Sequence, residues 1–151
     1  RFRPVDASAF RSAGARRSPL DEVLEAANVL SLHCNLTEET RNLIDEAAFD
    51  RFGPDGYLIN TSRGEVVDET ALREALRDGR LRGAGLDVFR EEPPSDAYAD
   101  LLGRPDVVAA GHYGWYSDPA YERLHRTAAT NMADLLVGDP PSDCLNPEIY
   151  G

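Results

Sequence analysis

The sequence predicts an α/β fold built on a doubly wound parallel sheet, and three observations predict it. Four short apolar runs, typical of strands, alternate along the chain with helical patterns. The runs lack strict alternation of apolar and polar residues, which indicates strands covered on both faces, as in a parallel sheet. Each helical pattern carries its own start and stop residues. The expected strands are 29–33, 57–61, 84–89 and 107–111.

The first two helices are predicted from capping residues. Ser18 is expected to cap a helix over 19–27, with Pro19 at its first helical position. Asp45 is expected to cap the next helix, and Gly53 to end it. Both helices are short, as connections between neighbouring parallel strands commonly are.

The third helix combines a cap with a clear apolar stripe. Asp68 is expected to cap it, and Gly79 to end it. Leu72, Ala75 and Leu76 recur at helical spacing and predict its buried face.

The last helix is the longest. Ser117 or Asp118, followed by Pro119, is expected to open it, and Gly138 to end it. One face is expected to carry Tyr121, Leu124, Ala128, Met132 and Leu135.

Composition narrows the classes of function. The chain has 151 residues and 42% hydrophobic content, enough for one compact domain with its own core. Its 27 acidic and 16 basic residues give a net charge of −11, and the basic residues are scattered. A phosphate backbone would be repelled, so we expect no direct binding of nucleic acid.

The cysteines and the apolar runs indicate a compartment. Cys34 and Cys144 lie far apart, and we see neither a signal peptide nor an apolar run able to span a bilayer. We therefore expect a reduced, cytoplasmic protein with no membrane partner. The chain begins at Arg1, not at a methionine, and its first residues read as part of a strand. We therefore also expect it to be part of a longer protein.

Polar residues follow each predicted strand. The carboxyl ends of parallel strands lie along one edge, where ligands of open α/β sheets bind. An arginine, carboxylates and a histidine are therefore expected on that edge. In strand order the residues are Cys34, Asn35 and Thr37; Ser62 and Arg63; Glu91 and Glu92; and His112, Tyr113 and Trp115.

These residue types suit the oxidation of a 2-hydroxy acid or the reduction of a 2-keto acid. Histidine can exchange the hydroxyl proton near neutral pH. A carboxylate bonded to the imidazole fixes its tautomer and favours its protonated form. Arginine can hold the substrate carboxylate bidentately. A cofactor must accept the hydride, because no side chain can.

The motifs resemble those of a known family. "INTSRGEVVDETALREALRDGRLRGAGLDVFREEP" is similar to the signature region of the D-isomer-specific 2-hydroxyacid dehydrogenases. "SLHCNLTEETRNLID" and "GHYGWYS" resemble the flanking motifs, and the resemblance runs from about Asp6 to Asn146. Within the family, "GWYS" is closest to the C-terminal-binding-protein branch, transcriptional corepressors that keep the dehydrogenase fold and bind NAD.

The resemblance implies a catalytic role for three residues. Arg63 would bind the substrate carboxylate and keto oxygen, and His112 would be the acid/base, with Glu92 as its partner. It also implies a set of NAD-binding residues and no metal. That set is Asp6 at the adenosine ribose, Cys34, Thr37 and Thr40 at the ribose and phosphates, Thr61, Ser62 and Arg63 at the nicotinamide, Asp87 at its carboxamide, and His112, Gly114 and Trp115.

The resemblance also implies that 1–151 is the C-terminal part of a Rossmann-type NAD-binding domain. The glycine-rich turn that should precede Asp6 and the separate substrate domain are expected to lie outside the chain. Relatives commonly dimerise through this domain, so a homodimer is expected. Departures from the family pattern imply an altered pocket; they are Asn35, Ala110, Gly111, Tyr113 and Gly114.

Several interpretations stay open. The first is an NAD-dependent oxidoreductase; the second is a corepressor-like NAD sensor with little turnover; the third is an inactive fragment. Taken singly, Arg63 and Glu92 could be surface charges and His112 structural. Of the other candidates, His33 is expected in the core or supporting the site, His125 exposed, and Cys34 buried rather than nucleophilic.

Overall fold

The computed structural model describes residues 10 and 12–150, so Asp6 lies outside the described residues. The chain divides into two units, Arg1–His112 and Tyr113–Gly151. The second unit contains the long C-terminal helix, none of whose residues is buried. The expectation of one domain stays a prediction.

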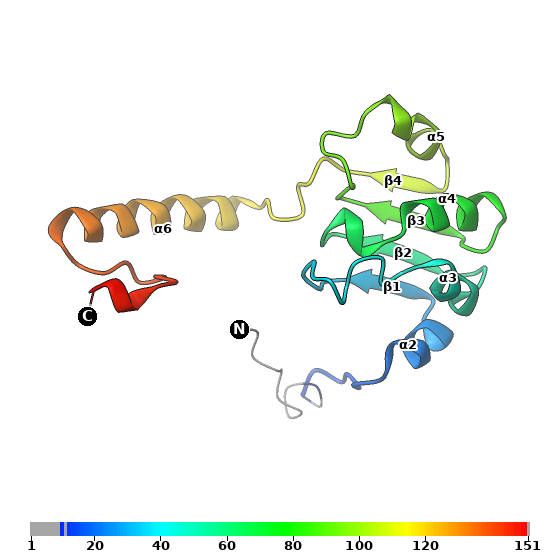
Figure 1. The fold of residues 1–151 in the computed structure, drawn as a ribbon, viewed down its shortest axis with the longest axis horizontal. Coiled ribbons are helices and arrows are strands. Elements are labelled where there is room, and N and C mark those ends of the chain that lie inside the picture. Colours follow the sequence, from blue (N-terminus) through cyan, green and yellow to red (C-terminus); the bar gives the residue numbers. More distant parts are fainter. Residues whose placement is uncertain (1–9, 11, 151) are drawn as a thin grey trace. The chain divides into compact units, whose positions relative to one another are not determined.

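The first unit is built on a parallel four-stranded sheet in the order β1-β2-β3-β4 (Figure 1). Both the predicted strands and their parallel pairing are confirmed. Each strand stops one to three residues before its predicted end, because the chain leaves the sheet to form the loops that carry the polar residues. The strands are β1 (Val29–Leu32), β2 (Tyr57–Asn60), β3 (Gly83–Leu86) and β4 (Val107–Ala109).

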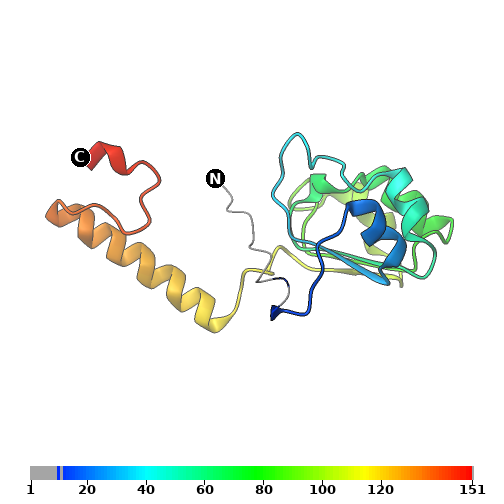
Figure 2. The ribbon, with the colours of Figure 1, turned by 90° about the horizontal axis from the view of Figure 1, so that it is seen from below.

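Helices α3 (Glu46–Phe52) and α4 (Glu69–Arg77) connect successive strands and lie on the same face of the sheet (Figure 2). Asp45 and Asp68 cap them as predicted. The Asp45 side chain accepts from Ala48 N at 2.9 Å, and Asp68 Oδ1 accepts from Thr70 N at 3.0 Å. The remaining elements of this unit are α2 (Leu20–Ala26), α5 (Ala99–Leu102) and the 3-10 helices η1 (Gly64–Val66) and η2 (Asp96–Tyr98).

The start of α2 differs from the prediction. Pro19, not Ser18, is the N-cap, and no side chain caps the helix. Pro19 has ψ 154°, which is extended, while its carbonyl accepts the first helical hydrogen bond from Val23 N at 3.2 Å. The helix therefore begins one residue later than expected.

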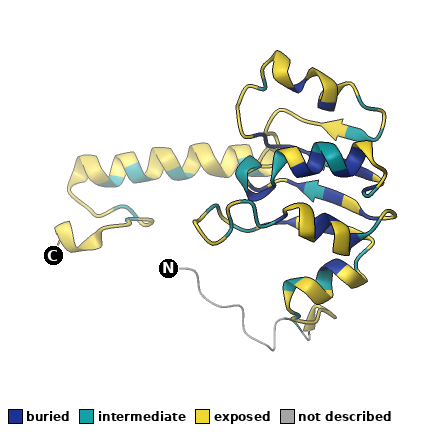
Figure 3. Cartoon of the chain, turned by 45° about the vertical axis from the view of Figure 1, so that its right-hand side comes forward, coloured by how far each residue is buried: buried dark blue, intermediate teal, exposed yellow. Residues whose placement is uncertain are grey.

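The core lies between the sheet and the helices on its one covered face (Figure 3). Its most deeply buried side chains include Phe49, Leu58 and Ile44. Within the described residues of the first unit, the opposite face of the sheet is exposed, so the prediction of cover on both faces is wrong for this unit. Val29 on β1 and Val108 on β4 are 58% and 74% exposed on that face.

The second unit consists mainly of α6 (Asp118–Val137), followed by the 3-10 helix η3 (Pro147–Tyr150). Ser117 is the N-cap, accepting from Ala120 N at 3.3 Å, and Gly138 ends the helix with φ 89°. These boundaries confirm the prediction. The predicted apolar stripe of α6 is largely exposed.

Two further observations concern the chain as described. No helix among the described residues is long and apolar enough to cross a membrane. Cys34 and Cys144 are both free thiols.

Candidate active site

Glu92 and His112 form a hydrogen-bonded pair. His112 Nδ1 lies 2.8 Å from Glu92 Oε2, and Glu92 Oε1 accepts from Phe89 N at 3.0 Å. Each carboxylate oxygen therefore has its own partner, which fixes the orientation of the carboxylate and of the ring it holds. The predicted contact between these residues, twenty positions apart in sequence, is confirmed.

The environment of Glu92 favours its ionised form. Burial raises the pKa of Glu92 and is the largest single influence, but the hydrogen bonds from His112 and Phe89 N–H and the nearby positive charges together outweigh it. The positive charges of His112 and Arg63 act in the same direction. The pKa of Glu92 therefore lies below its ordinary value, and the Arg63 charge reaches the same carboxylate.

The pair faces a pocket of about 530 Å³ on the first unit. Asp87, which follows β3 directly and is only 8% exposed, faces the same space. The pocket is mostly apolar apart from these three titratable side chains, as small-molecule sites commonly are. Its lining residues are Asp87, Phe89, Glu92, Pro93, Pro94, Leu102, Ala109, Ala110, Gly111 and His112.

Arg63 stands at the end of β2 and is held by a turn that Asn60 organises. The Asn60 side chain is 1% exposed; its Nδ2 donates to Arg63 O at 3.0 Å, and its Oδ1 accepts from Ser62 N and Ser62 Oγ, both at 3.0 Å. All three of these hydrogen bonds of the buried amide serve the Thr61–Arg63 turn. Arg63 itself is exposed, and its guanidinium donates to Ser62 O at 2.6 Å.

Asn60 was not among the residues that the sequence singled out. The available signal was an amide at an inward-facing position of a strand otherwise apolar on that side. A buried polar side chain must have partners, and here those partners form the turn before Arg63.

The Arg63 segment also packs directly against the Glu92 loop. A Cβ added at Gly64 would lie well under 3.0 Å from the carbonyl carbon and oxygen of Phe89 and from Arg90 N. The two backbones therefore touch, and glycine is required for this approach. The turn carrying Arg63 and the loop carrying Glu92 are thus fixed relative to each other.

A second pocket, of about 350 Å³, lies at the ends of β1 and β2. Its walls are mainly polar. Cys34 lies against the core on one side and lines the pocket on the other. The lining residues are His33, Cys34, Asn35, Leu36, Thr61, Ser62 and Arg63.

Other candidates are placed elsewhere or differently. Thr37 and Thr40 build the turn after β1, where Thr40 Oγ1 donates to Asn35 O at 2.6 Å, and neither lines this pocket. His33 is exposed and hydrogen-bonded to Ser31 Oγ, so of its two expected places the core is wrong, whereas its position lining the second pocket agrees with support of the site.

Gly114 and Trp115 belong to the second unit. The Trp115 ring is half-exposed and packs edge-on against Tyr116, with centroids 5.5 Å apart. His125, exposed as expected, lies over the Tyr121 ring at 4.1 Å. Among the described residues, no group of three or more His, Cys, Asp or Glu could hold a metal ion.

The strand-end arrangement combines three chemical capacities. An imidazole with one ring nitrogen held by a carboxylate can exchange a proton through the other. The Arg63 guanidinium at the end of β2 can bind a carboxylate. The adjacent pocket between β1 and β2 offers hydroxyls and backbone groups at the edge where α/β sheets bind ligands.

Comparison with known proteins gives a family match. Residues 2–114 match the model of the D-isomer specific 2-hydroxyacid dehydrogenase, NAD binding domain. The chain is 41% identical over 138 residues to glyoxylate/hydroxypyruvate reductase B of Citrobacter koseri, covering 91% of this chain and 42% of that protein. It is 39% identical over 141 residues to glyoxylate reductase of Korarchaeum cryptofilum, covering 92% of this chain and 42% of that protein.

Solved structures show the same fold. D-lactate dehydrogenase from Aquifex aeolicus, complexed with NAD and lactic acid, matches with a TM-score of 0.81 and 30% identity over 89% of this chain and 45% of that one. D-isomer specific 2-hydroxyacid dehydrogenase from Lactobacillus delbrueckii, in its NAD complex, matches with a TM-score of 0.82 and 28% identity. This match covers 95% of this chain and 47% of that one. The Rossmann-type fold is thereby confirmed. The chain spans less than half the length of the curated relatives it matches.

Proposed function

This chain belongs to the D-isomer specific 2-hydroxyacid dehydrogenase family, and on that premise we propose that its protein interconverts a small 2-keto acid and the D-2-hydroxy acid. The observation that carries the proposal is the Glu92–His112 pair, facing one pocket with Asp87. A carboxylate-held imidazole in an apolar pocket is suited to proton transfer.

His112 is the proposed acid/base. Its Nδ1 is bonded to Glu92, so Nε2 is the ring nitrogen that can exchange a proton with the substrate oxygen. In reduction, the imidazolium gives its proton to the keto oxygen as the substrate carbon receives a hydride. Glu92, ionised because its pKa is low, stabilises the imidazolium before this transfer.

Arg63 is the proposed ligand of the substrate carboxylate. Its guanidinium is exposed at the end of β2, while Asn60 and Ser62 hold its backbone. A planar cation with paired donors matches a carboxylate bidentately and orients the keto group beside His112. Orientation of this kind contributes strongly to catalysis.

NAD is the cofactor of the family domain that this chain matches, and the residues present fit it. The pocket at the ends of β1 and β2 offers the Thr61 and Ser62 hydroxyls and the backbone beside Cys34. The Asp87 carboxylate, facing the His112 pocket, can accept a hydrogen bond from a carboxamide. When bound, NADH supplies the hydride that no side chain can supply.

The relatives indicate the class of substrate. Two of them are named for glyoxylate, and one also for hydroxypyruvate, so we propose 2-keto acids of two or three carbons.

We further propose a homodimer working in the cytoplasm. The exposed aromatic residues Tyr113, Trp115 and Tyr116 of the second unit favour an interaction surface, and they keep an NAD-sensing, corepressor-like role as the second candidate.

Replacement of His112 tests the proposal. In the full-length protein, His112→Gln should lower kcat for NADH-dependent reduction of glyoxylate or hydroxypyruvate by roughly 10²–10⁴-fold, since general acid catalysis is lost. Absorbance of NADH follows the reaction. His125→Gln, an exposed histidine on α6, is the matched control and should leave kcat unchanged.

Unchanged turnover in His112→Gln would contradict the assignment of the proton donor. Negligible turnover of the unaltered protein on a panel of 2-keto acids, together with NADH-dependent dimerisation, would favour the second candidate instead.

A further inference from the structure

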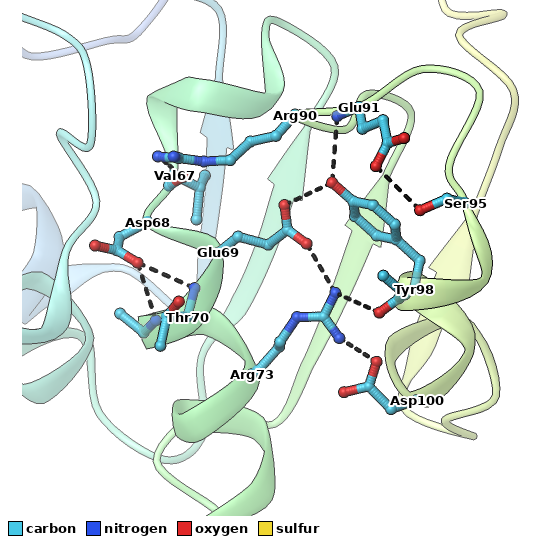
Figure 4. Close-up of polar contacts among 12 residues, drawn as sticks. Val67, Asp68, Glu69, Thr70, Arg73, Arg90, Glu91, Ser95, Tyr98 and Asp100 are labelled. Carbon is cyan, nitrogen blue, oxygen red and sulfur yellow. Dashed lines mark hydrogen bonds and ion pairs between the residues drawn. The ribbon is translucent and has the colours of Figure 1, made fainter.

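A buried tyrosine connects helix α4 to the loop that carries Glu92. Tyr98 is 5% exposed, and its hydroxyl has two partners (Figure 4). The hydroxyl donates to Glu69 Oε2 at 2.9 Å and accepts from Glu91 N at 3.2 Å. Glu91 directly precedes Glu92, so this one hydroxyl holds the backbone next to the proposed partner of His112.

Glu69 is a fixed anchor for that hydroxyl. It is the first residue of α4, and Arg73, one turn further on, donates to its Oε1 at 2.8 Å. Arg73 also donates to Ala97 O at 3.3 Å and pairs with Asp100, so it spans from α4 to the segment that carries Tyr98 (Figure 4). The Arg73 guanidinium lies 5.2 Å from the centre of the Tyr98 ring.

The other end of the Glu92 loop is held by the same tyrosine. The Phe89 ring packs edge-on against the Tyr98 ring, with centroids 5.5 Å apart. Phe89 N in turn donates to Glu92 Oε1 at 3.0 Å. Tyr98 thus contacts both Phe89 and Glu91, two residues of the short Phe89–Glu92 turn.

We propose that Tyr98 is a positioning residue, which sets the Glu92 carboxylate against His112 by holding the Phe89–Glu92 turn to helix α4. The inference rests on the proposed function of that pair. Burial and the hydrogen bond to Glu69 both raise the pKa of Tyr98, so its hydroxyl remains a donor throughout the neutral range. The Glu91 N–H, in turn, depends on this hydroxyl as its acceptor.

Loss of the hydroxyl alone should loosen the turn. Tyr98→Phe keeps the ring and its contact with Phe89, but leaves the Glu69 carboxylate and the Glu91 N–H without their shared partner. A shift of the turn moves the Glu92 carboxylate relative to His112, and misplacements of about 1 Å in catalytic groups cost up to roughly 10²-fold in rate.

The test uses the full-length protein with Tyr98→Phe and has two readouts. Kinetics with NADH and glyoxylate should show kcat lowered by about ten- to a hundred-fold with KM little changed. Carbon-13 NMR of labelled glutamate, assigned with Glu92→Gln, should show the pKa of Glu92 raised toward its ordinary value, because its two hydrogen bonds are weakened.

Two controls separate positioning from general stability. Tyr57→Phe makes the same change on the exposed face of the sheet and should alter neither readout. Leu24→Val, on the buried face of α2, should lower the melting temperature while leaving the Glu92 titration intact.

An unchanged Glu92 titration and an unchanged kcat in Tyr98→Phe would overturn the inference, as would an equal change in Leu24→Val. The NMR readout needs no turnover. If the unaltered protein reduces no 2-keto acid, the proposed function fails, and the Glu92 titration still decides the role of Tyr98.

Discussion

At the residue scale, His112 adopts an uncommon backbone conformation. Its φ is 62°, in the left-handed region that non-glycine residues rarely adopt. Such a conformation costs on the order of 1–3 kcal/mol and persists only where the surroundings impose it. Here the Glu92 hydrogen bond holds the ring in place. Strain of this kind gathers at functional sites, which agrees with the role proposed for His112.

The low pKa of Glu92 gives a pH-dependent stability. Its carboxylate is stabilised in the folded state, so its contribution to folding is fully present above the ordinary glutamate pKa of about 4.3 and is lost as pH falls through the lower folded value. We predict that the unaltered protein is more stable than Glu92→Gln at pH 7 and that this difference vanishes on acidification. Urea unfolding at a series of pH values measures it.

Glu91→Gln, which changes the neighbouring exposed carboxylate, serves as the control. A stability difference between the unaltered protein and Glu92→Gln that stays constant from pH 7 to pH 3 would contradict the prediction.

Part of the site could be predicted residue by residue. Arg63, Glu92 and His112 were predicted because each follows a strand, and the carboxyl ends of parallel strands lie along one edge of the sheet. Asn60 and Tyr98 escaped it, because their importance lies in hydrogen bonds to segments whose positions only the folded chain defines.

At the element scale, the helix boundaries followed local chemistry. Asp45, Asp68 and Ser117 cap their helices as predicted, since a capping side chain needs only the next three backbone N–H groups. At α2 the rule chose Ser18, whereas the extended Pro19 takes the cap position. Capping patterns are reliable where no proline competes for the same position.

The junction between the Arg63 turn and the Glu92 loop gives a prediction at the same scale. Gly64→Ala would place a Cβ against the Phe89 carbonyl, and backbone cannot move aside as a side chain can. We expect a loss of stability of at least about 1–3 kcal/mol, the usual cost of overpacking, together with reduced turnover. Guanidinium unfolding of the full-length protein measures it.

Gly85→Ala is the matched control on β3. There the added Cβ would meet only Ile59 Cδ1, at 2.9 Å, and the end of a side chain can rotate away. Equal stability losses at the two glycines would show that the backbone contact at Gly64 does not constrain the site.

At the scale of the whole molecule, the sequence predicted the sheet and the order of its elements, but not which faces of the sheet the helices cover. Continuous apolar strands indicated cover on both faces, while the described residues of the first unit supply helices on one (Figure 2). Periodicity on α6 likewise identified an apolar stripe without showing what it contacts. An apolar pattern indicates that a surface is suited to burial, but it does not identify the segment that packs against it.

The most direct test of the central claim is therefore made on the full-length protein, with Arg63→Gln. Loss of the carboxylate ligand should lower kcat/KM for glyoxylate by roughly 30- to 5,000-fold, equivalent to about 2–5 kcal/mol, while reduction of acetaldehyde, which lacks the carboxylate, should fall far less. Arg51→Gln, an exposed arginine on α3, is the control. Equal effects on the two substrates, or none on glyoxylate, would contradict the account.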